Sequence, residues 1–223
     1  MNGTYISLVG IGGCGKSTQA PLLAGWLREH GKPVIEVAEP GSTGLGLIVR
    51  EQVLNEGSKM DPLTEAFLFE SARSRLFVET ILPALEREEW VLSDRGPDDT
   101  EVFQGIVGGV DLELVQRMTL AATRGRLPDL TLLIDVNPKT GLGRAKGRGK
   151  VIRNTPQHNF IPELFGPTDD KFDEQGLDLF KRLRDAYVEL EARCEHVVRI
   201  DGEGERQAVQ DRIRVAVEPL LRR

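Results

Sequence analysis

A glycine-rich segment near the amino terminus has residue types and spacing suited to binding phosphate. Residues 10–17 read Gly-Ile-Gly-Gly-Cys-Gly-Lys-Ser, follow an apolar run and precede a segment of helical period, which is the context of a P-loop. Such glycines let backbone N–H groups turn inward around phosphate oxygens. Lys16 would contact the β- and γ-phosphates, and the Ser17 hydroxyl would contact Mg²⁺. The segment therefore predicts a nucleoside triphosphate site.

The nucleotide-binding set expected from this motif is Gly10, Ile11, Gly12, Gly13, Cys14, Gly15, Lys16, Ser17 and Thr18. Two interpretations of Cys14 stay open: a small residue tolerated at a tight turn, or a redox-sensitive thiol. The chain has two cysteines, Cys14 and Cys194. Two are too few for a disulfide framework, so we expect free thiols.

A second pair with chemical potential, Asp94-Arg95, ends another apolar run. Open α/β sheets bind ligands at the carboxyl ends of their strands. A carboxylate there can hold Mg²⁺ or its water shell, and an adjacent guanidinium can bind phosphate oxygens. We therefore expect Ser17 and Asp94 to organise the metal. The alternative is a strand-end turn with a surface ion pair.

The elements that must position these groups follow an alternating pattern. Apolar runs typical of buried strands alternate with segments of helical period. Asp61-Pro62 has the character of a helix N-cap followed by proline in the first turn. The runs cover residues 5–9, 33–37, 90–93, 130–136 and 196–200, and the helical segments follow Lys16 and fall within 61–89, 111–124, 176–194 and 205–221. This order predicts a parallel sheet covered by helices on both faces.

Composition favours one domain spanning residues 1–223, because the chain has 223 residues and 39% hydrophobic residues. The formal net charge is -6, from 29 basic and 35 acidic residues, which disfavours nucleic acid as a partner. No run of 18 apolar residues and no basic leader is present, so we expect a cytoplasmic protein without a membrane anchor. Residues 151–175 lack periodicity and predict an exposed flap.

Further motifs make the chain similar to thymidylate kinases over nearly its whole length. They occur in the order and approximate spacing of that family and comprise Glu39-Pro40-Gly41-Ser42-Thr43, Phe69 with Arg73, Pro83-Ala84-Leu85, Asp94-Arg95, Phe103-Gln104-Gly105, Pro128-Asp129-Leu130-Thr131 and Ile200-Asp201. The resemblance implies an α/β P-loop NTPase fold, a three-layer sandwich with a five-stranded parallel sheet. It also implies a lid at about residues 144–175, ATP and Mg²⁺ as cofactors, and a homodimer.

The resemblance also implies roles for individual residues. Phe69 would stack on the acceptor base, and Arg73 would bond its polar edge. Lys16, Asp94 and Arg95 would be catalytic, with Arg95 holding the acceptor phosphate. The remaining acceptor-side residues implied are Glu39, Arg50, Thr100, Phe103 and Gln104. On the donor side Arg144 would stack on adenine, and either Arg148 or Arg153 would act as an arginine finger.

Several departures from the family pattern lie on the acceptor side. Gly12 stands where an acidic residue is common, Ala38 where arginine is usual, Gly96 where an aromatic residue follows Asp-Arg, and Phe103 where tyrosine is usual. The function expected is transfer of the γ-phosphoryl group of ATP to dTMP, giving dTDP and ADP. One alternative is a related kinase for a different or modified nucleotide or a small phosphate ester. Another is a P-loop regulatory ATPase without an acceptor.

Overall fold

A computed structural model of the protein describes residues 3–54, 60–149 and 170–222. Its centre is a parallel five-stranded sheet with the order β2-β3-β1-β4-β5. The strands are β1 (Tyr5–Val9), β2 (Val34–Ala38), β3 (Trp90–Asp94), β4 (Leu130–Asp135) and β5 (Val197–Asp201). The predicted sheet and its five strands are confirmed.

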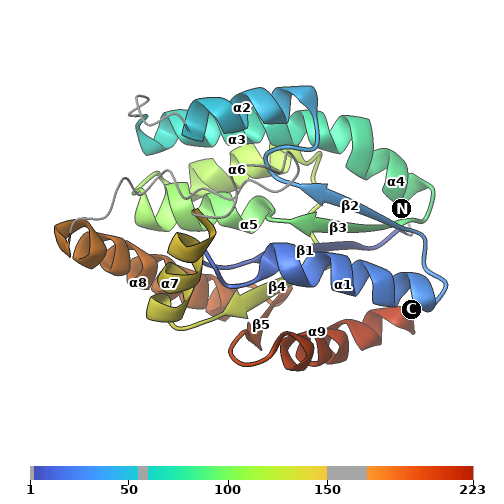
Figure 1. Cartoon of the computed structure of the whole chain (residues 1–223). Helices are drawn as coiled ribbons and strands as arrows, with labels where there is room; N and C mark the ends of the chain where they lie inside the picture. Colours follow the sequence, from blue (N-terminus) through green and yellow to red (C-terminus); the bar gives the residue numbers. More distant parts are fainter. Residues whose placement is uncertain (1–2, 55–59, 150–169, 223) are drawn as a thin grey trace.

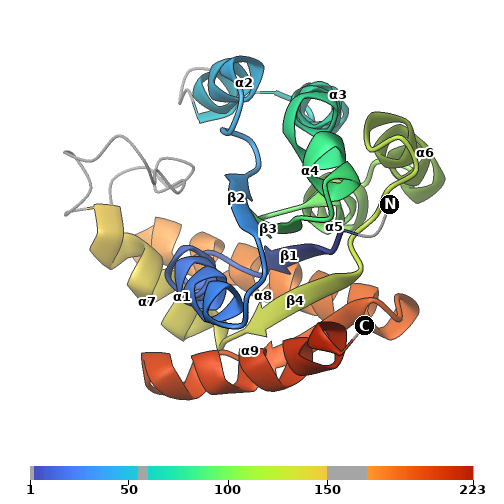
Figure 2. The same cartoon turned by 90° about the vertical axis from the view of Figure 1, so that its right-hand side faces the viewer.

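Helices cover both faces of this sheet, so the fold is the expected three-layer sandwich (Figure 1). One face carries α1 and α9, and the other carries α3, α4, α6 and α8 (Figure 2). The helices are α1 (Lys16–Glu29), α2 (Gly44–Leu54), α3 (Pro62–Leu76), the π-helix η1 (Phe77–Ile81), α4 (Leu82–Glu86), α5 (Pro97–Thr100), the π-helix η2 (Glu101–Val107), α6 (Leu112–Ala122), α7 (Pro138–Gly149), α8 (Asp170–Arg193) and α9 (Arg206–Leu221).

Local sequence signals explain where several of these helices begin. The Asp61 carboxylate accepts hydrogen bonds from the backbone N–H groups of Leu63 and Thr64, both at 3.1 Å, which confirms the predicted N-cap of α3. Asp111 caps α6 in the same way, accepting from the Leu114 N–H at 2.8 Å. Every residue of β1 is buried, because helices pack against both of its faces.

Three helical regions were not predicted. Gly44 and Gly46 weaken the helical signal of α2, and α5 with η2 begins at a Gly-Pro pair that is more typical of turns. In α7, four glycines do the same. Helix α8 also begins at Asp170, inside the stretch expected to be irregular. The rest of the expected lid, residues 150–169, lies outside the described residues.

Within the described ranges, none of the helices combines the length and the apolar character needed to span a membrane.

The central strands should dominate stability, so we predict a large cost for truncating Leu132. This β4 side chain is 0% exposed, and the change Leu132→Ala should lower the free energy of unfolding by about 2–5 kcal/mol through lost burial and a residual cavity. Val198 in β5 is 36% exposed, and Val198→Ala should cost under about 1 kcal/mol. Urea denaturation measures both. Equal costs would contradict this assignment of the core.

Candidate functional site

The carboxyl ends of the strands bring the predicted site residues to one edge of the sheet. The P-loop leaves β1, Glu39 follows β2, and Asp94 ends β3. Gly10 has φ 135°, and a Cβ there would lie 2.6 Å from the carbonyl oxygen of Ile134. The loop can therefore follow this path only with glycine at position 10.

The Lys16 side chain lies within the P-loop. Its side chain is 4% exposed, and Nζ donates to the carbonyl oxygens of Gly10 at 2.8 Å and Ile11 at 3.2 Å. Nζ also lies 3.4 Å from the Cys14 sulfur. The ammonium group is thus already held at the centre of the loop, where phosphate oxygens would replace these contacts.

Ser17 and Asp94 meet, although they are distant in sequence. The Ser17 hydroxyl donates to Asp94 Oδ2 at 2.5 Å, because β1 and β3 are adjacent strands. In the described part of the chain no group of three or more His, Cys, Asp or Glu side chains forms a metal cluster. A magnesium ion that binds through one or two protein oxygens and substrate phosphates needs no such cluster, so this pair fits the ion.

A hollow lies beside the P-loop. Arg144 from α7 borders it, is 39% exposed at its side chain, and lies 3.9 Å from Glu203. The lining residues are Gly13, Cys14, Gly15, Thr18, Gln19, Arg144, Gly202, Gly204, Arg206 and Val209. The loop after β5 therefore borders this hollow, together with Gln19, whose Nε2 donates to the Arg206 carbonyl at 3.1 Å.

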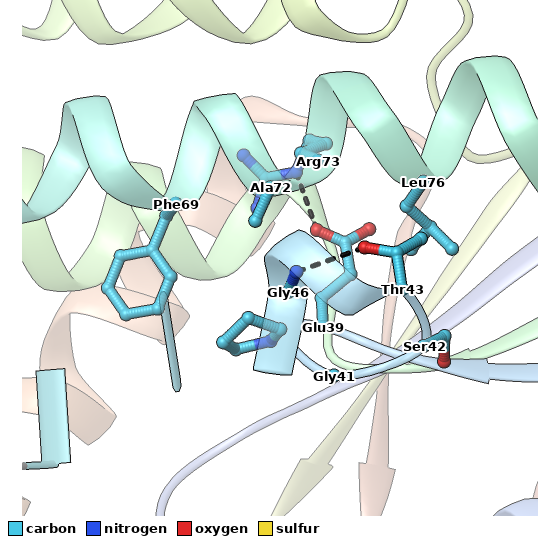
Figure 3. Close-up of a pocket in the computed structure, with 10 residues that line it drawn as sticks. Glu39, Gly41, Ser42, Thr43, Gly46, Phe69, Ala72, Arg73 and Leu76 are labelled. Atoms are coloured by element: carbon cyan, nitrogen blue, oxygen red, sulfur yellow. Dashed lines mark hydrogen bonds and ion pairs between the residues drawn. The ribbon is translucent and has the colours of Figure 1, made fainter. Parts of the chain in front are cut away.

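A second pocket lies between the loop after β2 and helix α3 (Figure 3). Phe69 and Arg73 project into it from one face of α3, as their four-residue spacing predicts. Glu39 faces them from the other side. The lining residues are Glu39, Pro40, Gly41, Ser42, Thr43, Gly46, Phe69, Ala72, Arg73 and Leu76.

Arg73 is a buried cation between two carboxylates. Nε donates to Glu39 Oε2 at 2.6 Å, Nη1 pairs with Glu70, and Nη1 also donates to Thr100 Oγ1 at 3.1 Å. Burial lowers the pKa of Arg73, but the charges of Glu39 and Glu70 raise it by more than burial lowers it, so the net shift is upward. Burial raises the pKa of Glu39, and Arg73 only partly offsets this shift. Arg73 is therefore a buried, paired cation and not a solvated surface side chain.

Two more arginines, Arg50 and Arg95, lie close enough to repel each other. Burial lowers the pKa of Arg50, and the charge of Arg95 lowers it further. Arg50 Nη1 donates to the Pro40 carbonyl at 3.2 Å, which ties it to the loop after β2. The Arg50 guanidinium therefore experiences the charges of both Arg95 and Asp94.

Arg95 has an enclosed environment built from α5, η2 and α8. Its Nη1 lies 3.5 Å from Asp99 Oδ1, and its guanidinium lies 5.7 Å from the Phe103 ring centroid. The Phe103 ring is edge-on to Tyr187, with centroids 6.3 Å apart. The interpretation of Asp94-Arg95 as a surface turn is therefore wrong, because the Arg95 side chain is only 16% exposed.

The other predicted residues have different environments. Thr100 is buried and touches the pocket through Arg73, whereas Gln104 is buried and donates to Glu65 at 3.0 Å. The side chain of Arg148 and all of Arg153 lie outside the described residues. Gly96 has no room for a side chain, because a Cβ there would lie 2.8 Å from the Ser7 Cβ. Its departure from the family pattern is thus matched by packing.

Sequence reasoning missed Glu70, Asp99 and Tyr187 on the acceptor side. Glu70 and Tyr187 belong to ordinary helical periods and carried no signal of their own. Asp99 belongs to the polar run 98–100 directly after Asp94-Arg95-Gly96-Pro97. The one signal available in the sequence was this run of polar residues, which closely follows the end of an apolar strand.

Comparison with known proteins agrees with this geometry. The family model described as thymidylate kinase matches residues 8–213. A thymidylate kinase of Desulfosudis oleivorans is 38% identical over 216 residues, covering 96% of each chain. This chain belongs to the thymidylate kinase family. A thymidylate kinase of Caldanaerobacter subterraneus is 34% identical over 223 residues, covering 100% of this chain and 98% of the relative.

The fold of this thymidylate kinase family member also matches a solved structure. The crystal structure of thymidylate kinase from Ehrlichia chaffeensis superposes with a TM-score of 0.73 at 24% identity, covering 97% of this chain and 100% of that one. The expected family and the P-loop NTPase fold are confirmed. Family membership makes the chain an ATP-dependent phosphotransferase.

The short helix α5 is anchored to the sheet by an ion pair that should titrate. His196 Nε2 lies 3.2 Å from Asp98 Oδ1, and Asp98 Oδ2 accepts from Thr131 Oγ1 at 2.6 Å. The hydrogen bond to Asp98 raises the pKa of His196 above its ordinary range, and burial opposes this only in part. Protonated His196 therefore stabilises the folded state.

We predict a pH-dependent cost of His196→Gln. Because the folded-state pKa is raised, the stabilisation is complete below the unfolded pKa and is lost as pH rises through the folded pKa. The difference in unfolding free energy between wild type and variant should be largest near about pH 6 and should shrink towards about pH 8. In an Asp98→Asn background this pH dependence should disappear. Denaturation at a series of pH values measures it, and a pH-independent difference would refute the role of the pair.

Proposed function

We propose that this protein is a thymidylate kinase that transfers the γ-phosphoryl group of ATP to dTMP, giving dTDP and ADP. Family membership supports this substrate pair over another nucleotide. One observation carries the proposal for this chain: a P-loop and a separate positive centre made by Arg50 and Arg95 share one edge of the sheet. A regulatory ATPase would have no use for the second centre.

The positive centre suits the phosphate of an acceptor. Two partly buried guanidinium groups that repel each other are stabilised by a dianion that contacts both of them. Asp94 offsets part of the repulsion in the free protein, since its charge raises the pKa of Arg50. Arg50 and Arg95 would therefore bind the dTMP phosphate, and the guanidinium forks would orient its oxygens.

The base would occupy the pocket of Figure 3, stacked on Phe69. Arginine has five N–H donors, and four are used by Glu39, Glu70, Thr100 and the Gly96 carbonyl among the described residues. One donor on Nη2 of Arg73 is left for an acceptor atom of the base. A pyrimidine with a carbonyl oxygen at this edge fits that donor better than one with an amino group.

On the donor side Lys16 would exchange its contacts with the loop carbonyls for the β- and γ-phosphate oxygens of ATP. Mg²⁺, when bound, would neutralise charge on the transferring phosphate. Ser17 and Asp94 would hold the ion from one side, and Arg144 would cover the adenine from α7. Phosphoryl transfer requires mainly positioning and charge neutralisation, which these residues supply.

We further propose that residues 1–223 form a single kinase domain with a lid at about 144–175. Either Arg148 or Arg153 of this lid would place a positive charge beside the phosphoryl group during its transfer. The protein would act in the cytoplasm, which agrees with its two unpaired cysteines.

Loss of the Lys16 side chain should impair catalysis rather than folding. Lys16→Ala should lower kcat for dTMP-dependent ADP release by roughly 10²- to 10³-fold, because one transition-state donor is lost. Lys181→Ala, an exposed lysine of α8, should leave kcat unchanged. A coupled assay with ATP and dTMP, dUMP, dCMP or dGMP measures the rates. Release that no acceptor accelerates, or that dTMP accelerates no more than the others, would contradict the proposal.

The implied homodimer has a candidate surface on the outer helices. Helix α2 packs against α3 and α3 against α6 (Figure 1). These helices expose the apolar side chains of Leu47, Ile48, Phe67 and Leu120. Exposed apolar surface of this kind is commonly buried in protein–protein interfaces. We propose that two copies of the chain bury this face against each other.

Charge placed on this surface should dissociate the dimer. Ile48 is 58% exposed, and Ile48→Asp would bury an unpaired carboxylate in the interface, so the variant should be monomeric by light scattering. Val215 of α9 is 71% exposed, and Val215→Asp should leave the mass unchanged. A monomeric wild-type protein at micromolar concentration would eliminate the proposed interface.

A further inference from the structure

Helix α5 carries two neighbouring carboxylates that contact different partners. Asp98 faces β4 and His196, as described above. Asp99 faces Arg95: its Oδ2 accepts from the Gly96 N–H at 3.1 Å, and its Oδ1 accepts from the Tyr187 hydroxyl. The same Oδ1 lies 3.5 Å from Arg95 Nη1. One carboxylate oxygen is therefore fixed by the backbone, and the other is shared between a hydroxyl and a guanidinium.

Tyr187 belongs to α8 and is linked to Arg95 indirectly, through contacts with two other residues. Its hydroxyl holds Asp99, and its ring meets Phe103 edge-on, while Phe103 lies under the Arg95 guanidinium. Tyr187 is 1% exposed. Burial and then the Asp99 charge raise its pKa well above the usual value, so the hydroxyl keeps its proton and donates.

The backbone of Arg95 needs such support. Its φ is 77°, in the left-handed region that arginine rarely adopts, and its N–H donates to the Leu8 carbonyl at 3.0 Å. The backbone is therefore anchored on β1, and the direction of the long side chain is set by what surrounds it. Burial lowers the pKa of Arg95, but Asp99 and then the other neighbouring groups raise it, so the net shift is upward.

We propose that Tyr187 and Asp99 are positioning residues that aim Arg95 at the phosphate of the acceptor. Asp99 lies at one edge of the guanidinium, Phe103 lies against its face, and Tyr187 contacts both, so these three side chains fix the direction of the Arg95 guanidinium. This inference rests on the proposed role of Arg95 in acceptor binding. It assigns helix α8 a part in acceptor recognition, although no residue of α8 was predicted to belong to the site.

The test compares Tyr187→Phe, Asp99→Asn and the double variant. Tyr187→Phe keeps the ring contact with Phe103 and removes only the hydroxyl. Each single change should raise KM for dTMP about tenfold, the loss expected for one hydrogen bond to a charged group, with KM for ATP within about twofold. Both changes disrupt the same chain of contacts, from Tyr187 through Asp99 to Arg95, so KM for dTMP of the double variant should also be raised about tenfold. A rise equal to the product of the two single effects would refute this shared chain of contacts.

Asp98→Asn is the matched control, since it alters the neighbouring carboxylate on the same helix, whose contacts are with Thr131 and His196. It should lower the melting temperature and leave KM for dTMP within about twofold. An increase equal to that of Asp99→Asn would mean a general disturbance of α5 and would overturn the inference. If Asp99→Asn does not fold, Tyr187→Phe alone still tests the proposal. An unchanged or lower KM for dTMP in this variant would refute it.

Calorimetry with dTMP and with thymidine adds a readout that a structural role alone would not move. Tyr187→Phe should weaken dTMP binding about tenfold and leave thymidine binding unchanged, because only dTMP carries the phosphate that Arg95 contacts. Equal weakening of both ligands would contradict the inference. A wild-type protein that does not phosphorylate dTMP would instead refute the proposed function, whereas an active wild type with unaffected variants would refute only the positioning role.

Discussion

The contact between the Ser17 hydroxyl and the Asp94 carboxylate is the point from which the rest of the site is arranged. It exists because β1 and β3 are neighbours in a parallel sheet, so both chains leave the sheet at the same edge. On one side of this contact the P-loop surrounds Lys16. On the other side lie Arg50, Arg73 and Arg95. Strand order thus brings the P-loop and these arginines to one edge of the sheet, where we propose that donor and acceptor bind.

The acceptor half is organised by a small number of buried charges. Arg73 is held between Glu39 and Glu70, and Arg95 beside Asp99. Such groups are costly to bury alone, and each is compensated by an opposite charge and by hydrogen bonds. The four-residue helix α5 links the two arginines, because Thr100 contacts Arg73 and Asp99 contacts Arg95. The proposed sites for the base and the phosphate therefore both depend on helix α5.

Much of the fold could be predicted because its signals are local. The apolar runs 5–9, 90–93 and 130–136 correspond to β1, β3 and β4 to within two residues, and Asp61-Pro62 marked the start of α3. The prediction failed where glycine weakens a helical pattern, as in α2 and α7, and where a Gly-Pro pair begins α5. Tertiary packing stabilises those helices, so their own sequences carry a weak signal.

The sequence by itself determined the P-loop, the parallel sheet, the shared face of Phe69 and Arg73, and membership of a kinase family, because each depends on spacing along one segment. Only the tertiary structure decided which distant groups meet. Asp99 and Tyr187 are 88 residues apart, and Arg73 is 34 residues from Glu39. No periodicity records such pairs, because a buried hydrogen bond depends on how helices pack around the sheet and on which charges that packing leaves without water.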